Sequence, residues 1–332
     1  MEHKTTPKVS FIIPTRNEER YIRKCLDSIL ALDYPKDKIE ILIAEGNSTD
    51  KTEKIIREYM AKHDNIKLLK NPAGNTAIGR NLCIDGSTGD MLMNYSGHAI
   101  AEKDLLRVVA FKLAGMPEDV AGVGISNVSP PKQNFVGEMA NTTFRGFMAG
   151  AGTFSQNAVF DEEKFVDHMA FTCYRREIFD IVGKFDSEFR SGQDAELDIR
   201  IKKAGYKILY TPKTRVYLFK RDTIRGLFRQ LYRYSIARVK MIKKYPDTMS
   251  VFHLLPPLFI IGVIAIALLW IIGFIPGIMI IILIILYAIL CIISSLMATR
   301  NPIKIAASIF FYLLIQVAYG VGFIRGIFYG RL

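Results

Sequence analysis

The sequence lacks the cysteine pairs and the glycine loops that identify several common protein classes. Its four cysteines are scattered, and no two of them have the spacing of a metal-binding pair, so we expect reduced thiols without a structural disulfide. Neither G-x-G-x-x-G nor G-x-x-x-x-G-K-[ST] occurs. A dinucleotide-binding fold and a P-loop ATPase would therefore both lack the loop that holds their phosphates.

Charge is almost absent beyond Ser250, and this part of the chain is mainly apolar. A helix needs ~20 mainly apolar residues to cross the ~30 Å hydrocarbon core of a membrane. Three stretches have this length, 252–274, 276–298 and 303–324. They predict about three transmembrane helices, and the alternative for the third stretch is a re-entrant segment.

The N-terminus has no apolar signal region, so we expect the first 250 residues to stay in the cytoplasm. Lys243 and Lys244 before the first stretch, and Arg300 and Lys304 after the second, agree with a cytoplasmic excess of positive charge. Arg325, after the third stretch, conflicts with it. The sequence thus predicts a multi-pass protein of the cell membrane.

The formal net charge of +12 raises the question of nucleic acid as a partner. The positive charge is most concentrated just before the apolar tail, which favours anionic lipid headgroups or phosphorylated lipids instead. We therefore expect a membrane partner and no nucleic acid. The domains expected are a cytoplasmic domain over 1–219, a basic interfacial helix over 220–250 and a membrane domain over 251–332.

The first half of the chain alternates short β-branched apolar runs with segments of helical spacing. The expected strands cover 9–14, 39–44, 66–69 and 91–95, and a later strand is expected to end at Tyr210-Thr-Pro212. Alternation of this kind predicts an α/β fold with a mostly parallel sheet and helices on both faces. Polar clusters at 15–18, 45–50 and 96–98 follow three of these strands, so they should meet at one rim, where open α/β sheets bind ligands.

Four segments together resemble family 2 glycosyltransferases of the GT-A fold, in particular the exopolysaccharide and succinoglycan type with C-terminal membrane helices. They are Phe11-Ile-Ile-Pro-Thr-Arg-Asn-Glu-Glu19, Glu45-Gly-Asn-Ser-Thr-Asp50, Gly79-Arg-Asn81 and Gln193-Asp-Ala-Glu-Leu197. The resemblance covers roughly residues 8–245. It implies a nucleotide-sugar donor, a UDP-sugar by preference, and a divalent cation, either Mn or Mg.

The resemblance also implies which residues bind the donor. Glu45 stands where the family usually has an Asp that binds the nucleotide base, and Arg80 is the candidate contact for the diphosphate because guanidinium forks match phosphate geometry. The alternative for Arg80 is a solvent-exposed helix residue. The other expected donor contacts are Pro14, Thr15, Arg16, Glu18, Asn47, Ser96 and Gly97.

The metal motif departs from the family pattern. Relatives have Asp-any-Asp after the fourth strand, where this chain has Ser96-Gly97-His98. A neutral imidazole binds divalent cations and suits manganese better than magnesium, so His98 is the expected ligand. The alternative is an ordinary polar residue. Ser96 brings no charge, so the donor diphosphate would complete more of the coordination.

Asp194 matches the catalytic base of the family, and Gln193 replaces the Glu that usually precedes it and is expected near the acceptor. Asp194 also opens a segment with helical character. The alternative is that it only caps this helix, since aspartate is a good N-cap residue.

A basic stretch carries arginines at every fourth position, Arg221, Arg225, Arg229 and Arg233, which form one stripe of a helix. Apolar residues on its other faces are expected to enter the membrane interface, namely Ile224, Leu227, Phe228 and Leu231. Within the stretch, Gln230, Arg233 and Tyr234 resemble the Q-x-x-R-W motif of membrane-bound relatives, which implies contacts with the acceptor. The alternative is a solvated charged helix.

The resemblance implies an inverting transfer of a sugar to a lipid-linked or membrane-proximal acceptor, with Asp194 as the general base. Three alternatives stay open. They are a processive polysaccharide synthase, a polyprenyl-phosphate sugar synthase, and a degenerate scaffold that binds nucleotide sugars without turnover.

Overall fold

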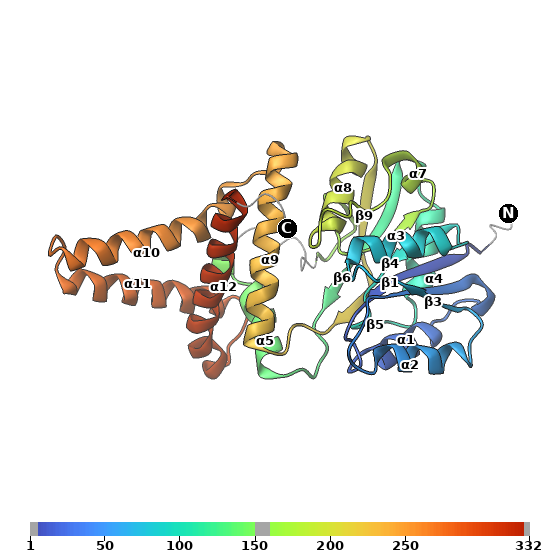
Figure 1. The fold of residues 1–332 in the computed structure, drawn as a ribbon, viewed down its shortest axis with the longest axis horizontal. Helices are drawn as coiled ribbons and strands as arrows, with labels where there is room; N and C mark the ends of the chain where they lie inside the picture. Colours follow the sequence, from blue (N-terminus) through green and yellow to red (C-terminus); the bar gives the residue numbers. More distant parts are fainter. Residues whose placement is uncertain (1–5, 150–159, 329–332) are drawn as a thin grey trace. The chain divides into compact units, whose positions relative to one another are not determined.

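The computed structural model describes residues 6–149 and 160–328 (Figure 1). The chain divides into two compact units, one formed by residues 1–130 with 158–219 and the other by 131–157 with 220–332. The sequence predicts a boundary at 219, and the second unit contains in addition a segment from the middle of the chain.

The first unit is built on one mixed sheet with the strand order β3-β2-β1-β4-β8-β6-β9-β5, and β7 pairs with β9. Strands β1 to β4 run parallel to their neighbours within this group, whereas β8 lies antiparallel between β4 and β6. The strands are β1 (Val9–Thr15), β2 (Ile39–Glu45), β3 (Ile66–Lys70), β4 (Met91–Asn94), β5 (Ala99–Ala101), β6 (Val120–Val128), β7 (Lys164–Val166), β8 (Phe171–Arg175) and β9 (Lys207–Leu218).

Both faces of the sheet are covered, because alternate residues of each strand point to opposite sides. In β1, Phe11 and Ile13 pack in one apolar cluster with helices α1 (Ile22–Leu30), α2 (Thr52–Met60) and α4 (Leu105–Ala114). Ile12 packs in the other cluster with α3 (Thr76–Gly86), α7 (Ile178–Val182) and α8 (Gln193–Lys203). A single turn, η1 (Lys36–Lys38), precedes β2. The predicted α/β fold with helices on both faces is confirmed.

The first four predicted strands are each found within one or two residues of their expected bounds. The strand end expected at Pro212 is wrong, because β9 continues to Leu218. The pairing of β9 with β6 shifts register between Ile125 and Ser126, opposite Thr211 and Arg215. Proline cannot donate a ladder hydrogen bond, and this irregularity lets Pro212 sit inside a continuing strand.

The second unit is helical. Its elements are α5 (Phe135–Phe144), η2 (Phe147–Ala149), α9 (Ile224–Lys244), η4 (Pro246–Thr248), η5 (Val251–His253), α10 (Leu255–Ile271), α11 (Gly277–Leu296) and α12 (Pro302–Phe328). Two helices of the described chain, α11 and α12, are long and apolar enough to cross a membrane, and α10 is apolar but has 17 residues. Pro256 and Pro257 lie in the first turn of α10, where proline is tolerated.

The arginine stripe predicted for the basic segment is present on α9. Arg221, which precedes the helix, and Arg225, Arg229 and Arg233 within it are all exposed. The expected entry of Leu227 and Leu231 into the membrane interface is wrong, because both are buried in an apolar cluster with α5 and α12. Phe228 packs beside this cluster, and Ile224 is exposed.

Candidate active site

The three polar clusters that follow β1, β2 and β4 meet at one rim, as the sequence predicts. Gly46 donates its N–H to the carbonyl of Thr15 at 2.8 Å. The side chain of Asn17 accepts a hydrogen bond from the N–H of Thr49 at 2.8 Å. A Cβ built on Gly97 would lie 3.1 Å from Thr15 Oγ1, so the third cluster is in contact with the first.

The turn after β2 is shaped by Glu45, which is fully buried. One carboxylate oxygen accepts the N–H of Ser48 at 2.6 Å and the other accepts the N–H of Asn47 at 3.2 Å. Asn47 has a φ of 54°, in the left-handed region that Asn tolerates better than most residues. Its side-chain amide donates to the carbonyl of Pro72 at 3.2 Å. The buried Glu45 carboxylate therefore fixes the backbone of this turn through two hydrogen bonds.

Arg16 extends from the end of β1 over Gly74. A Cβ built on Gly74 would lie 2.9 Å from Arg16 Nη1, and the φ of Gly74 is +58°. Both observations favour glycine at this position. Pro14 lies beside α3, since a Cβ on Gly79 would be 3.1 Å from the Cβ of Pro14. The residues expected to bind the donor thus form one continuous rim from β1 to the start of α3.

His98 and Glu18 form a pair that sequence reasoning missed. His98 Nδ1 lies 2.8 Å from Glu18 Oε1 and 3.1 Å from Ser96 Oγ, and both side chains are partly buried. A carboxylate can only accept a hydrogen bond when ionised, so this contact favours a proton on Nδ1 and leaves Nε2 as an acceptor, 3.4 Å from Ser96 Oγ. The two residues are 80 positions apart, and no local pattern links them.

The chemistry of this pair fits a divalent cation that is held together with a diphosphate. A metal-bound histidine usually donates its other ring N–H to a carboxylate, as His98 can donate to Glu18. No group of three or more His, Cys, Asp or Glu side chains gathers anywhere in the described residues.

Arg80 is a buried helix residue, so the alternative of a solvent-exposed arginine is wrong. Its side chain on α3 is 8% exposed, and its guanidinium carbon lies 5.1 Å from the ring centre of Phe185. Among the described residues, neither Nε nor Nη1 of Arg80 has a hydrogen-bond partner. Burial lowers the pKa of Arg80, and the negative charge of Asp194 works in the opposite direction.

Asp194 lies in the first turn of α8 and does not cap it. The N-cap is Gly192, in the left-handed conformation with φ 70°, and the helix begins at Gln193. Asp194 Oδ1 accepts the N–H of Ala195 at 3.0 Å. Gln193 is buried, and its side-chain oxygen has no hydrogen-bond partner in the described part of the chain. The interpretation of Asp194 as an N-cap is therefore wrong.

Two buried carboxylates on α8 fix the position of Asp194. Asp198, one turn further on, accepts hydrogen bonds from Tyr174 Oη at 2.7 Å and His168 Nδ1 at 2.6 Å. Burial raises the pKa of Asp198 against the lowering effect of these bonds. Glu196 is fully buried and binds Arg200, with 2.8 Å between Oε2 and Nη2.

Arg200 also connects α8 to the loop that carries Phe185. Its guanidinium donates to the carbonyls of Val182, Gly183 and Lys184, the last at 2.7 Å. Asn81 on α3 holds the same loop from the other side through both the N–H and the carbonyl of Phe185. The loop that carries Phe185, beside Arg80, is therefore hydrogen-bonded both to α3 and to α8, the helix that carries Asp194.

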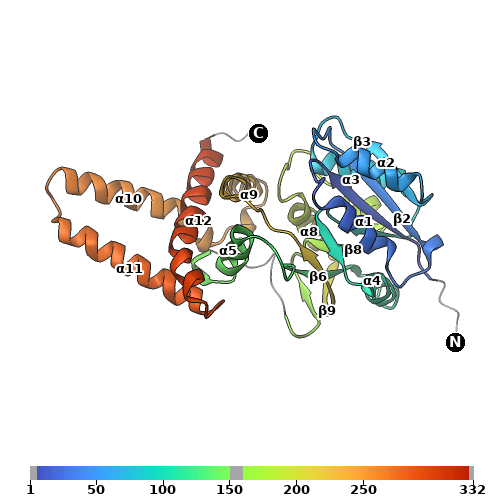
Figure 2. The ribbon, with the colours of Figure 1, turned by 90° about the horizontal axis from the view of Figure 1, so that it is seen from below.

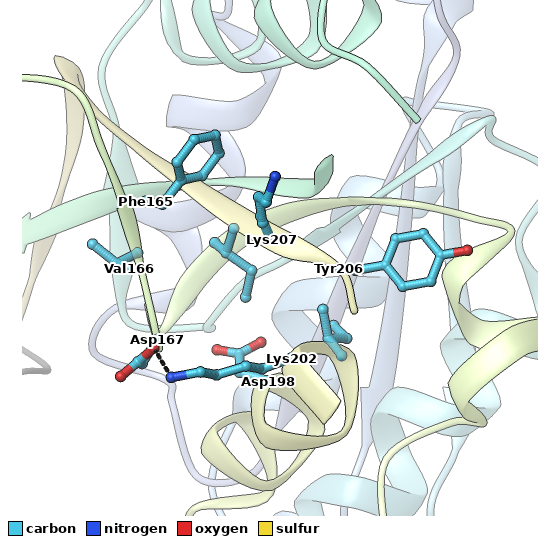
Figure 3. Close-up of a pocket in the computed structure, with 9 residues that line it drawn as sticks. Phe165, Val166, Asp167, Asp198, Lys202, Tyr206 and Lys207 are labelled. Atoms are coloured by element: carbon cyan, nitrogen blue, oxygen red, sulfur yellow. Dashed lines mark hydrogen bonds and ion pairs between the residues drawn. The ribbon is translucent and has the colours of Figure 1, made fainter. Parts of the chain in front are cut away.

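A cavity of about 250 Å³ lies beside α8 and is shown in Figure 3. Lys202 on its wall is paired with Asp167 at 2.6 Å, and Lys207 is paired with Asp119 at 2.7 Å. Asp198 is held by Tyr174 and His168. Since these charged side chains already have partners, we assign no ligand to this cavity.

Three of the four residues expected to contact the acceptor, Gln230, Arg233 and Tyr234, lie on α9 in the second unit, whereas Gln193 lies on α8 in the first. Gln230 Nε2 donates to Tyr234 Oη at 2.9 Å, one helical turn away. Arg233 is exposed on the same helix. The pair of Gln230 and Tyr234 keeps the amide in a fixed orientation.

Two family models match this chain. The family model "Glycosyl transferase family 2" matches residues 10–183, and "Glycosyl transferase family group 2" matches residues 103–301. The chain is 31% identical over 329 residues to a Methanococcus voltae enzyme named dolichyl N-acetyl-alpha-D-glucosaminyl phosphate 3-beta-D-2,3-diacetamido-2,3-dideoxy-beta-D-glucuronosyltransferase, covering 96% of this chain and 98% of that protein.

Two further similarities extend the comparison. The succinoglycan biosynthesis protein ExoA of Rhizobium meliloti is 26% identical, with 76% of this chain and 75% of that protein covered. The solved mannosyltransferase PcManGT from Pyrobaculum calidifontis, in complex with GDP-Man and Mn2+, has the same fold with a TM-score of 0.68 and 19% identity, covering 98% of this chain and 88% of that one. The chain therefore belongs to glycosyl transferase family 2 and is a glycosyltransferase of the GT-A fold.

Proposed function

We propose that this glycosyltransferase moves a sugar, with inversion, from a nucleoside-diphosphate sugar to a lipid-linked acceptor. Arg80 carries the proposal. A buried guanidinium with two unpaired nitrogens is costly unless an anion binds it, and a planar fork is suited to phosphate oxygens. In this proposal Arg80 binds the diphosphate and stabilises the charge that develops there as the bond to the sugar breaks.

Asp194 is the general base of the proposed reaction. A sugar hydroxyl is a weak nucleophile at neutral pH, so it needs a proton acceptor within hydrogen-bond reach. The buried bonds of Asp198 and Glu196 hold α8 in place, and they leave Asp194 as the partly exposed carboxylate of the first turn. Gln193 beside it would donate or accept a hydrogen bond with an acceptor hydroxyl through its amide.

His98 would hold the divalent cation, with Mn preferred over Mg because this ligand is an imidazole. When bound, the cation supplies positive charge that offsets the negative charge of the leaving diphosphate. His98 would bind through Nε2, and Glu18 would keep the proton on Nδ1. The remaining donor contacts, from Pro14 to Arg16 with Asn47, Ser96 and Gly97, would surround the nucleotide, for which we favour UDP, and the buried Glu45 would shape the turn that carries Asn47.

The name of one relative supports the proposed acceptor, and the second unit supports the proposed location. The Methanococcus voltae relative is named for a dolichyl-phosphate-linked acceptor, and we propose an acceptor of this lipid-linked class here. The exposed arginines of α9 are suited to phosphate groups at a membrane surface. We place the enzyme in the cell membrane with its catalytic unit in the cytoplasm, and Gln230, Arg233 and Tyr234 as acceptor contacts.

Titration of the purified protein with UDP and GDP, with and without Mn2+, tests the role of Arg80. Arg80→Lys keeps the charge but loses the fork, and one lost charge-assisted hydrogen bond of ~1.5–3 kcal/mol weakens diphosphate binding by roughly 10–150-fold. Arg57→Lys is the matched control, because Arg57 is exposed on α2 and pairs with Glu53. Unchanged binding by Arg80→Lys would remove the diphosphate role.

A panel of nucleotide sugars incubated with membrane lipid extract, with products measured by mass spectrometry, identifies donor and acceptor. A single added sugar on a glycolipid supports the proposal. A long homopolymer would indicate a processive polysaccharide synthase. A sugar attached directly to a polyprenyl phosphate would indicate a polyprenyl-phosphate sugar synthase. Donor binding without any product would indicate a scaffold.

A further inference from the structure

Helices α10 and α11 form a hairpin with apolar residues on nearly all sides. In Figures 1 and 2 the two helices lie side by side, and α12 runs across their base in both views. The most apolar stretch of α11 is 11% buried within the protein, against 56% for α12. The turn between α10 and α11, residues 272–276, contains no charged residue. The hairpin therefore has the surface of a membrane-inserted element, and α12 does not share it.

Helix α12 is bound along its length to α9. Leu227 and Leu231 of α9 share a buried cluster with Phe311 and Ile315 of α12. Further along, a Cβ on Gly322 would lie 2.5 Å from the carbonyl oxygen of Tyr232. Close approach of the two backbones therefore requires glycine at this point.

The contact continues to the ends of both helices. A Cβ on Gly326 would lie 3.0 Å from the Cβ of Val239. Lys243 Nζ donates to the carbonyls of Gly326 and Ile327 at 3.1 and 2.8 Å. Wherever α12 lies relative to the bilayer, α9 from Leu227 to Lys243 lies there with it.

This pairing sets a condition on where α12 can lie. The outward face of α9 carries Arg225, Arg229 and Arg233, all exposed. If α12 crossed the bilayer, these charges would be carried into the hydrocarbon core, where an unpaired arginine is strongly disfavoured. The described acidic residues of this unit are Glu138, Asp222 and Asp247. None of them lies within α9, so the helix itself supplies no carboxylate to pair with these arginines.

The charges at the helix ends give an independent argument. Lys243 and Lys244 precede the hairpin, and Arg300 and Lys304 follow it. If the hairpin alone crosses the membrane, these residues and Arg325 all lie on one side, as the positive-inside rule requires. With three crossings, Arg325 would lie on the opposite side.

We infer that the chain crosses the membrane twice, through α10 and α11, and that α12 lies flat on the membrane surface beside α9. The outward face of α12 is apolar, with Phe310, Leu313 and Val321 exposed at 50, 42 and 40%. A helix with one face packed on protein and the other apolar is suited to the boundary between headgroups and acyl chains. The partner of this face is therefore the cytoplasmic leaflet of the lipid bilayer.

Reporter fusions test the number of crossings. A fluorescent protein that folds only in the cytoplasm, or alkaline phosphatase that is active only outside, is attached before Met1, after Leu332 or within the turn at Gly273. We expect both ends to report the cytoplasm and the turn to report the outside. A C-terminal fusion on the outside would overturn the inference, and so would a turn that reports the cytoplasm. The two terminal fusions leave the protein sequence unchanged.

Spin labels then measure the depth of α12 in the bilayer. Labels at Phe310 and Val321 are 11 residues apart, so they would differ in position by ~16 Å along the membrane normal if α12 crossed it. We expect equal, shallow depths at both sites, measured by the ratio of oxygen to polar-quencher accessibility in liposomes. Ile284 in the middle of α11 is the matched control and should be deep. A depth difference near the full ~16 Å would overturn the inference.

Discussion

Replacing Asp194 by asparagine separates the chemical role of this residue from its structural one. Asp194 Oδ1 accepts the N–H of Ala195, and the Oδ1 of asparagine can accept the same bond. The helix N-cap is Gly192, so it is unchanged by the substitution. What the variant loses is a negative charge in the first turn of α8 and the ability to take up a proton.

The two losses have different sizes. A carboxylate in the first turn of a helix contributes ~0.3–1 kcal/mol through the helix dipole, so stability should fall by no more than this. Loss of a positioned general base slows proton transfer by ~10²–10⁴-fold, which is ~2.7–5.4 kcal/mol in the activation barrier. We therefore expect Asp194→Asn to lose turnover by this factor, with donor binding and melting temperature close to those of the wild type.

The assay measures sugar transfer to the lipid acceptor, UDP binding and thermal melting on the same preparations. Asp180→Asn is the matched control, because Asp180 is an exposed carboxylate in the first turn of α7. Transfer by Asp194→Asn at a near-normal rate would refute the reasoning. Glu196 could not then take over the role simply, since it is fully buried and bound to Arg200.

Two further predictions concern the carboxylates of Glu18 and Glu40. Glu18→Gln keeps an acceptor for His98 Nδ1, so this variant should bind Mn2+ in the presence of UDP nearly as well as the wild type. Glu18→Ala should bind Mn2+ ~10–100-fold more weakly, measured by electron paramagnetic resonance of free Mn2+. An equal loss of Mn2+ affinity in both variants would make Glu18 a metal ligand itself. Burial acts to raise the pKa of Glu40, but hydrogen bonds from Lys67, Ser10 and Thr88 lower it to about 2. Its contribution to stability is therefore complete above pH ~4.5 and is lost as the pH falls towards 2. Glu40→Gln should cost ~1–3 kcal/mol at pH 7 and flatten this part of the pH–stability curve, and an unchanged curve would contradict it.

The sequence predicts the first half of the sheet well because its information is local. Strands β1 and β2 are continuous β-branched runs bounded by turn residues, which is typical of strands buried on both faces. The second half depends on distant pairings. Strand β9 pairs with β6 about 87 residues earlier, as in Val120 with Lys207, and no periodicity encodes this pairing. The proline that marks a strand end in most contexts lies here beside a register shift.

The candidate site also has some features that the local sequence predicts and others that depend on distant residues. Each rim cluster directly follows a strand, so the order of strands in the sequence predicts that they meet. The pair of Glu18 and His98 was missed because a motif of three consecutive residues directs attention to His98 alone. The burial of Arg80 could not be predicted either, since it depends on a loop 104 residues later that Asn81 and Arg200 hold against α3.

The pairing of α9 with α12 has a consequence for the order in which the protein is made. Leu227, Leu231 and Val239 of α9 are covered by residues of α12 that leave the ribosome about 80 positions later, among them Phe311 and Phe323. During that interval the part of this face that packs on α12 lacks its cover, while α5, which precedes α9 in the chain, shares its cluster. Since exposed apolar surface promotes aggregation, the nascent α9 needs a temporary cover, and its arginine stripe makes the membrane surface a suitable one. Synthesis that stops at Asn301 should therefore yield an inserted but aggregation-prone protein.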